Sequence, residues 1–112
     1  MQAVNDIPHL SPEDVWGRAS KGEVVLIDVR EPDEVQMVAI AGAVNVPLTS
    51  FDPQAVLKAA GDKEIVFFCK MGGRAINACQ YFTGLTGRAA SCMTGSITSW
   101  VQKGLPVTSS GA

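Results

Sequence analysis

Two short runs of consecutive apolar residues constrain the fold of this chain most strongly. Residues 24–27 read VVLI and lead to Asp28, and residues 65–68 read IVFF and lead to Cys69. A strand that is apolar at every position must be covered on both faces, as happens in a parallel sheet between helices. The runs therefore predict two central strands, over residues 23–29 and 64–69.

Helix signals alternate with these strands. A polar residue before proline predicts helix starts at residues 11–12, 31–32 and 52–53, ending near Gly22 for the first helix and near Ala60 for the third. Apolar residues at helical spacing predict a fourth helix over residues 75–82, with Gly84 at its end, and a fifth follows around residues 97–102. Further short strands are predicted near residues 43–46 and 89–93. This alternation predicts one α/β domain over residues 7–107, with frayed ends at 1–6 and 108–112.

Charge, hydropathy and cysteine usage exclude several classes of function. Nine Lys and Arg against eleven Asp and Glu give a net charge of −2, so we expect no nucleic-acid partner. No apolar run approaches the roughly 20 residues that cross a bilayer, which predicts no membrane partner. Three cysteines without a CxxC pair, and the single histidine His9, suggest neither a disulfide framework nor a metal site. We expect a cytoplasmic protein in a reducing compartment.

The segment FFCKMGGR carries the chemistry. It places Cys69 beyond the carboxyl end of a central strand, where open parallel sheets form ligand sites. The N–H groups of the following loop and first helical turn have no helical partners, so they can point at one anionic atom, and the glycines at 72 and 73 let the backbone curl. Together with the cations of Lys70 and Arg74, they favour thiolate over thiol and predict that Cys69 is a nucleophile. The sequence supplies no clear histidine base, which argues against a cysteine protease.

Four motifs in order give the chain a resemblance to the single-domain rhodanese (thiosulfate sulfurtransferase-like) family. They are LIDVREPDE, AGAVNVPL, CKMGGR and TGSITSWVQKGLPV. The resemblance implies a five-stranded parallel sheet flanked by helices on both faces. It also implies that Cys69 is the catalytic residue, which carries sulfane sulfur from thiosulfate or a similar donor to a thiol or cyanide as a persulfide. The substrate-binding residues implied in this way are Lys70, Met71, Gly72, Gly73 and Arg74, and no cofactor or metal is implied.

Details of the loop refine what this resemblance implies. Four residues separate Cys69 from Arg74, whereas phosphatase and arsenate-reductase relatives have five, and Lys70 favours thiosulfate over mercaptopyruvate as donor. Three positions depart from the family pattern. Ala75 stands where a serine is usual, residues 39–43 (AIAGA) replace His-Ile-Pro-Gly-Ala, and residues 94–96 (TGS) replace the common Gly-Gly.

Alternatives remain open from the sequence. The same cysteine would serve a protein-to-protein persulfide carrier, loaded by a desulfurase or another sulfur-relay protein, and the departures also allow a non-catalytic rhodanese-like binding module. A phosphatase ranks last because the loop is short. We expect Cys79 and Cys92 to be structural and Trp16 and Trp100 to be core aromatics. Asp28 and Arg30 are interpreted as structural residues that fix a turn or pair with neighbours, with Asp28 also a weaker candidate near the site.

Overall fold

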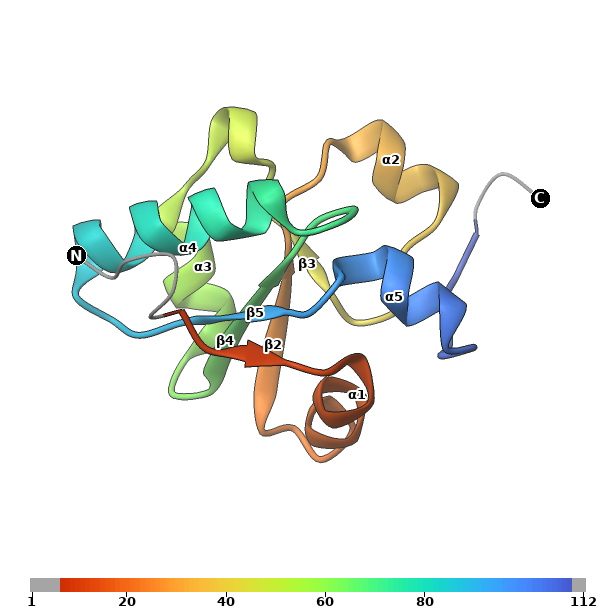
Figure 1. The fold of residues 1–112 in the computed structure, drawn as a ribbon. Helices are drawn as coiled ribbons and strands as arrows, with labels where there is room; N and C mark the ends of the chain where they lie inside the picture. Colours follow the sequence, from red (N-terminus) through yellow and green to blue (C-terminus); the bar gives the residue numbers. More distant parts are fainter. Residues whose placement is uncertain (1–6, 110–112) are drawn as a thin grey trace.

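The central sheet contains five parallel strands in the order β1-β5-β4-β2-β3 in the computed structural model, which describes residues 7–109 (Figure 1). The strands are β1 His9–Leu10, β2 Val24–Asp28, β3 Val44–Asn45, β4 Glu64–Phe68 and β5 Ser91–Met93. β2 and β4 pair along their whole length, from Val24 with Glu64 to Asp28 with Phe68. The five-stranded parallel sheet and the two predicted central strands are confirmed.

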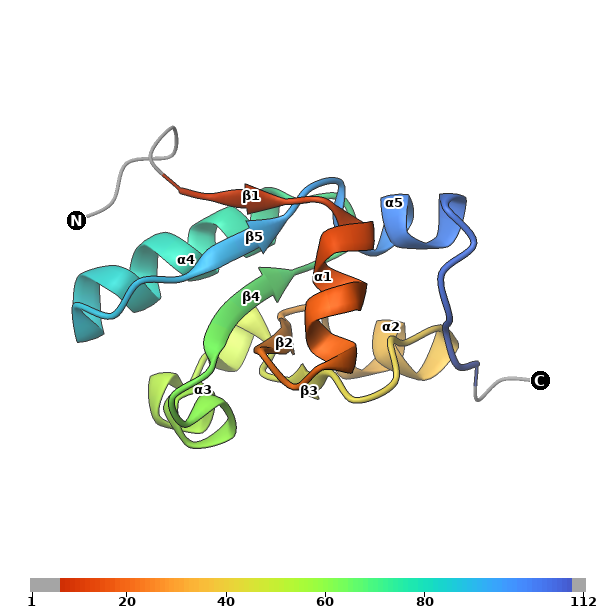
Figure 2. The same ribbon diagram turned by 90° about the horizontal axis from the view of Figure 1, so that it is seen from below.

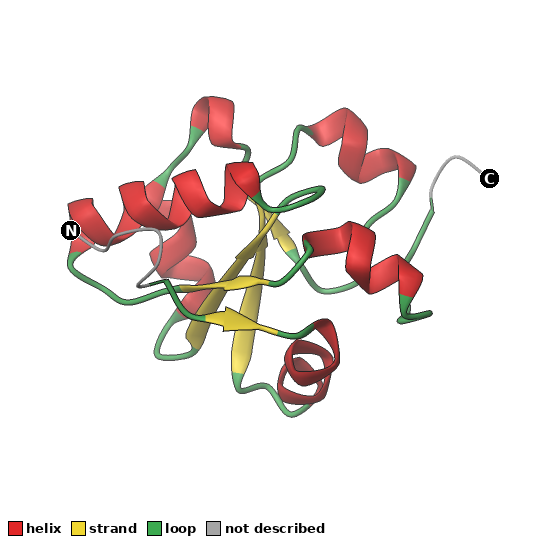
Figure 3. Cartoon of the chain, in the orientation of Figure 1, coloured by secondary structure: helices red, strands yellow, loops and turns green. Residues whose placement is uncertain are grey.

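Helices cover both faces of this sheet, which explains why its central strands are apolar throughout (Figure 2). α3 (Pro53–Ala60) and α4 (Gly73–Thr86) pack on one face, around Phe67, Val56 and Phe82. α1 (Pro12–Ser20) and α5 (Ser96–Gln102) pack on the other, around Phe68 and Trp100. α2 (Pro32–Met37) follows β2 and lies beside α5, beyond the carboxyl end of the sheet (Figure 3).

The predicted helix starts form for the expected local reasons. The Ser11 side chain accepts the N–H of Asp14 at 3.1 Å, and the Asp52 side chain accepts the N–H of Gln54 at 3.0 Å. At the start of α2, the Glu31 N–H donates to the Glu34 carboxylate at 3.0 Å, one half of a capping box. These caps fix where each helix leaves the sheet.

Some local predictions were wrong. Gly84 lies inside α4, which continues to Thr86 and ends at Gly87, whose φ is +72°. Trp16 is 45% exposed, because it faces solvent from α1, whereas Trp100 is buried as expected. The predicted fraying of residues 1–6 falls outside the described residues. Near the other end, Thr108 forms an antiparallel bridge with Ala39, with N···O distances of 2.7 and 2.9 Å.

None of the described helices is long and apolar enough to cross a membrane. Within residues 7–109, no three His, Cys, Asp or Glu side chains gather where they could hold a metal ion.

Candidate active site

Cys69 follows the last residue of β4, the middle strand of the sheet, and is 1% exposed. The loop after it leads directly from β4 into α4, where the carboxyl edge of the sheet meets the start of a helix (Figure 1). The arrangement of strand, glycine-bearing loop and helix is the one expected from the sequence. It places the buried Cys69 sulfur next to the backbone N–H groups at the start of the helix.

The loop backbone curls around the Cys69 sulfur. The N–H of Gly72 donates to Sγ at 3.0 Å, and Gly72 has a φ of +137°, a conformation that side chains other than glycine rarely adopt. The first helical bond of α4 runs from the Ile76 N–H to the Gly72 carbonyl at 3.0 Å. The N–H groups of Gly73 and Arg74 precede that bond and have no partner inside the helix.

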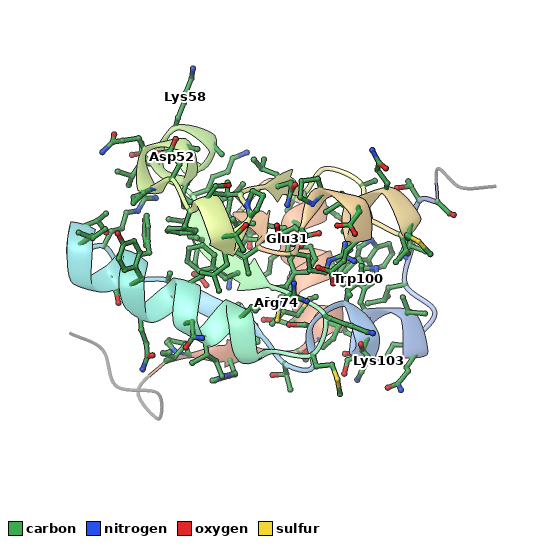
Figure 4. All side chains as sticks on the ribbon, turned by 90° about the horizontal axis from the view of Figure 1, so that it is seen from above. Glu31, Asp52, Lys58, Arg74, Trp100 and Lys103 are labelled. Atoms are coloured by element: carbon green, nitrogen blue, oxygen red, sulfur yellow. The ribbon has the colours of Figure 1, made fainter. Side chains whose placement is uncertain are left out.

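The Arg74 guanidinium is bound to a carboxylate of α2. Its Nη1 and Nη2 donate to the two Glu34 oxygens at 2.7 and 3.0 Å. Figure 4 shows Arg74 at the start of α4, facing the segment that carries Glu31. The hydrogen bonds from Arg74 lower the pKa of Glu34 to about 2, although partial burial acts in the opposite direction. Glu34 in turn raises the pKa of Arg74. Arg74 therefore ties α4 to α2. The sequence analysis did not single out Glu34 as a site residue.

Lys70 and Met71 form the outer part of the loop. Met71 is 71% exposed, and Lys70 is also exposed. Among residues 7–109, no carboxylate lies within ion-pair distance of the Lys70 ammonium. Lys70 is thus the cation of the loop that is available to an anionic ligand.

The start of α5 forms the other wall of the site. The N–H groups of Ile97 and Thr98 donate to the carbonyls of Cys69 and Lys70, each at 3.1 Å, and the Thr98 hydroxyl donates to the Lys70 carbonyl at 2.8 Å. The Cys69 N–H donates to Ser96 Oγ at 3.1 Å. Ser96 was noted in the sequence only as a departure from the family pattern, and the structure places it directly beside the nucleophile.

A groove of about 450 Å³ opens between α2 and α5, next to the loop. Its walls are mainly apolar and include Met37, Val38, Ile97 and Val101, with Lys70 at the loop side. Met37 is 73% exposed and Val101 48% exposed, so apolar surface faces solvent beside the nucleophile. The charged groups Arg30 and Glu34 that also line the groove are each engaged in an ion pair.

Asp28 and Arg30 form a buried pair under α2. Arg30 Nη2 lies 2.7 Å from Asp28 Oδ2 and Nε lies 3.0 Å from Oδ1, and both side chains are at most 3% exposed. Arg30 also donates to the carbonyls of Val38 at 2.8 Å and Glu34 at 3.4 Å. The pair joins β2 to α2, which agrees with its interpretation as structural.

Cys79 and Cys92 lie in the core between α4 and the sheet, both free and buried. The Cys79 thiol donates to the Ala90 carbonyl at 3.5 Å. Interaction with Cys79, together with burial, raises the pKa of the Cys92 thiol above its ordinary value. Both thiols lie within the core and make no contact with the groove, which is in keeping with their expected structural role.

Comparison with known proteins agrees with this geometry. Residues 11–103 match the model of the rhodanese-like domain family. The thiosulfate:glutathione sulfurtransferase of Saccharomyces cerevisiae is 33% identical over an alignment of 115 residues, gaps included. The alignment covers 90% of this chain and 83% of the yeast protein. The human thiosulfate:glutathione sulfurtransferase is 27% identical and covers 86% of this chain and 95% of its own length. The crystal structure of a rhodanese-related protein from Thermoplasma volcanium superposes with a TM-score of 0.76 at 26% identity, covering 90% of this chain and 97% of that one.

The fold and the site define an α/β protein with a buried cysteine at the N-terminus of a helix. The chain belongs to the rhodanese-like domain family. Its relatives support rhodanese-type sulfurtransferase activity as the general class of function.

Proposed function

We propose that the protein transfers sulfane sulfur from thiosulfate, or a similar small anionic donor, to a thiol or to cyanide through a persulfide on Cys69. The observation that carries this proposal is the Gly72 N–H bond of 3.0 Å to Sγ, at the start of α4. Backbone donors and a helix N-terminus stabilise a thiolate and an anionic outer sulfur alike. The names of the yeast and human relatives, which specify thiosulfate and glutathione, support this choice of donor and acceptor.

The proposed cycle has two displacements. The Cys69 thiolate attacks the outer sulfur of thiosulfate, the S–S bond of the donor breaks, and sulfite leaves with the bonding electron pair. An acceptor thiolate then attacks the outer sulfur of the Cys69 persulfide, and the S–S bond between that sulfur and Sγ breaks. The acceptor leaves with the outer sulfur as its own persulfide, and Cys69 returns to a thiolate. The electrons and atoms balance without a metal or an organic cofactor.

The loop residues have different parts in this proposal. The backbone N–H groups of residues 70–74 hold the outer sulfur, and the Lys70 ammonium attracts the anionic donor. Met71 lies at the outer side of the loop, where an incoming donor or acceptor passes. Arg74 is already bound to Glu34 by two hydrogen bonds, so its main part is to fix the start of α4. We place this activity in the cytoplasm and assign it to a domain over residues 7–107.

A second candidate function is a protein-to-protein sulfur carrier, because an apolar groove adjoins the loop. Exposed apolar side chains such as Met37 and Val101 offer a surface that a small donor such as thiosulfate does not need. In this reading a partner protein covers the groove while its thiol exchanges sulfur with Cys69. Faster loading by a cysteine desulfurase than by thiosulfate would favour the carrier.

Intact-mass spectrometry tests the persulfide directly. The reduced protein is measured before and after thiosulfate and again after cyanide, beside a Cys69→Ala variant, and a matched Cys79→Ala variant controls for removal of a buried thiol. We expect a gain of one sulfur, about 32 Da, that cyanide removes and that only the Cys69 variant lacks. A gain that persists in Cys69→Ala would refute the assignment of the nucleophile. No gain in the parent protein would refute thiosulfate as donor.

A further inference from the structure

The first residue of α5, Ser96, has a backbone conformation that requires an explanation. Its φ is +53°, and within residues 7–109 it is the one residue other than glycine with a positive φ. Left-handed backbone costs a residue with a side chain about 1 kcal/mol or more, and such strained residues gather at functional sites. Gly95, just before it, also has a positive φ of +70°. Two consecutive residues at the start of α5 therefore have left-handed backbone conformations.

These two left-handed residues place the Ser96 hydroxyl beside Cys69. Ser96 is fully buried, and its Oγ accepts the N–H of Cys69 at 3.1 Å. The same oxygen lies 3.9 Å from Cys69 Sγ, with the hydroxyl as donor. The bonds from the Ile97 and Thr98 N–H groups to the carbonyls of Cys69 and Lys70 hold this end of α5 against the loop.

The proton of this hydroxyl has one acceptor within reach. A serine hydroxyl can accept and donate at the same time, and the Cys69 N–H already uses one of its lone pairs. Among the described residues, Sγ of Cys69 is the acceptor to which the Ser96 hydroxyl can donate its proton. A buried hydroxyl without an acceptor is unfavourable, so the proton points at the sulfur.

We propose that Ser96 is a further active-site residue, whose hydroxyl donates a hydrogen bond to the inner sulfur of Cys69. This inference rests on the proposed sulfur transfer, in which Sγ carries negative charge as the nucleophile and again as the leaving group. The Gly72 N–H donates to Sγ from the loop, and the Ser96 hydroxyl reaches the same sulfur from the opposite wall. The residue after Arg74 is Ala75, which has no hydroxyl, so Ser96 supplies the site with a hydroxyl donor from α5.

Two variants of Ser96 and a matched control test this role. Ser96→Ala removes the hydroxyl but keeps Cβ, and Ser96→Gly removes the hydroxyl and the conformational strain together. Ser91→Ala is the control, because Ser91 is also buried but lies in β5, and its side chain makes no hydrogen bond among the described residues. The rate of iodoacetamide modification of Cys69 is measured from pH 4 to 10, by peptide mass spectrometry that separates Cys69 from Cys79 and Cys92.

We expect the pH midpoint of Cys69 modification to rise by about one pH unit in both Ser96 variants, as loss of one hydrogen bond to a thiolate requires. Sulfur release from loaded Cys69 to a thiol should slow about threefold, because a thiolate that is less stabilised is a poorer leaving group. Ser91→Ala should match the parent in both measurements.

An unchanged pH midpoint in Ser96→Gly would overturn the proposal, even if Ser96→Ala were too unstable to measure. A Ser96 variant with a lower melting temperature but the parental pH midpoint would equally overturn it. In that case Ser96 would only stabilise the fold by accepting the Cys69 N–H. The alkylation measurement does not need sulfur transfer. A shifted midpoint in a protein that takes no sulfur from thiosulfate would therefore support Ser96 and refute the proposed function.

Discussion

Removing the Asp28 carboxylate should destabilise the protein more than any change to its exposed ion pairs. In Asp28→Ala the Arg30 guanidinium loses three contacts of 2.7 to 3.2 Å to the carboxylate while it stays enclosed, since both side chains are at most 3% exposed. Breaking a buried pair from one side costs about 3–5 kcal/mol, because a buried charge is left without its partner. With a urea dependence of about 2 kcal/mol per molar, the unfolding midpoint should fall by about 2 M.

The assay is urea unfolding at pH 7, followed by tryptophan fluorescence and circular dichroism. An Asp28→Ala/Arg30→Met double variant should be less destabilised than Asp28→Ala alone, because it removes the unpaired charge together with its partner. Glu13→Gln, which breaks an exposed pair with Lys103, is the control and should leave the midpoint close to that of the parent. The reasoning would be refuted by Asp28→Ala matching this control, or by additive losses in the double variant.

Two further predictions concern the charges around the loop. Glu34→Gln should lower the free energy of unfolding by about 1 kcal/mol at pH 7. Because the pKa of Glu34 falls on folding to about 2, the stabilisation is complete above the unfolded value of about 4.3 and is lost as the pH falls through about 2. Denaturation at pH 7 and pH 2 should therefore show the full difference at pH 7 and only a small remainder at pH 2, and an equal difference at both would contradict the ion pair. Lys70→Gln should raise the KM for thiosulfate about fivefold at low salt, with a smaller effect at high salt. Lys58→Gln on α3 should leave KM unchanged, and a parental KM in Lys70→Gln would exclude Lys70 from donor binding.

Local patterns in the sequence predict most of the fold. The apolar runs before Asp28 and Cys69 locate the central strands, because strands covered on both faces leave no polar alternation. Proline after a capping residue locates the starts of α1, α2 and α3. Strand β1 was not predicted, since two residues, His9 and Leu10, carry no periodicity and are defined as a strand only by their pairing with β5.

The candidate site is only partly visible in the sequence. The loop from Cys69 to Arg74 is continuous, so its members can be identified from their spacing and from the glycines that let it curl. Glu34 precedes its partner Arg74 by 40 residues, and Ser96 follows Cys69 by 27 residues. Both reach the site only through tertiary packing. Ser96 did leave one trace, as a serine where relatives commonly have a glycine, but only the backbone angle and the burial show where its hydroxyl lies.

The short outer strands limit how this protein can associate with other chains. β1 and β3, at the two margins of the sheet, have two residues each, so an approaching strand finds very little backbone to pair with. Such margins oppose sheet extension and edge-to-edge aggregation. Any protein that binds this chain must then contact side-chain surfaces, such as the groove between α2 and α5, and not the backbone of an outer strand.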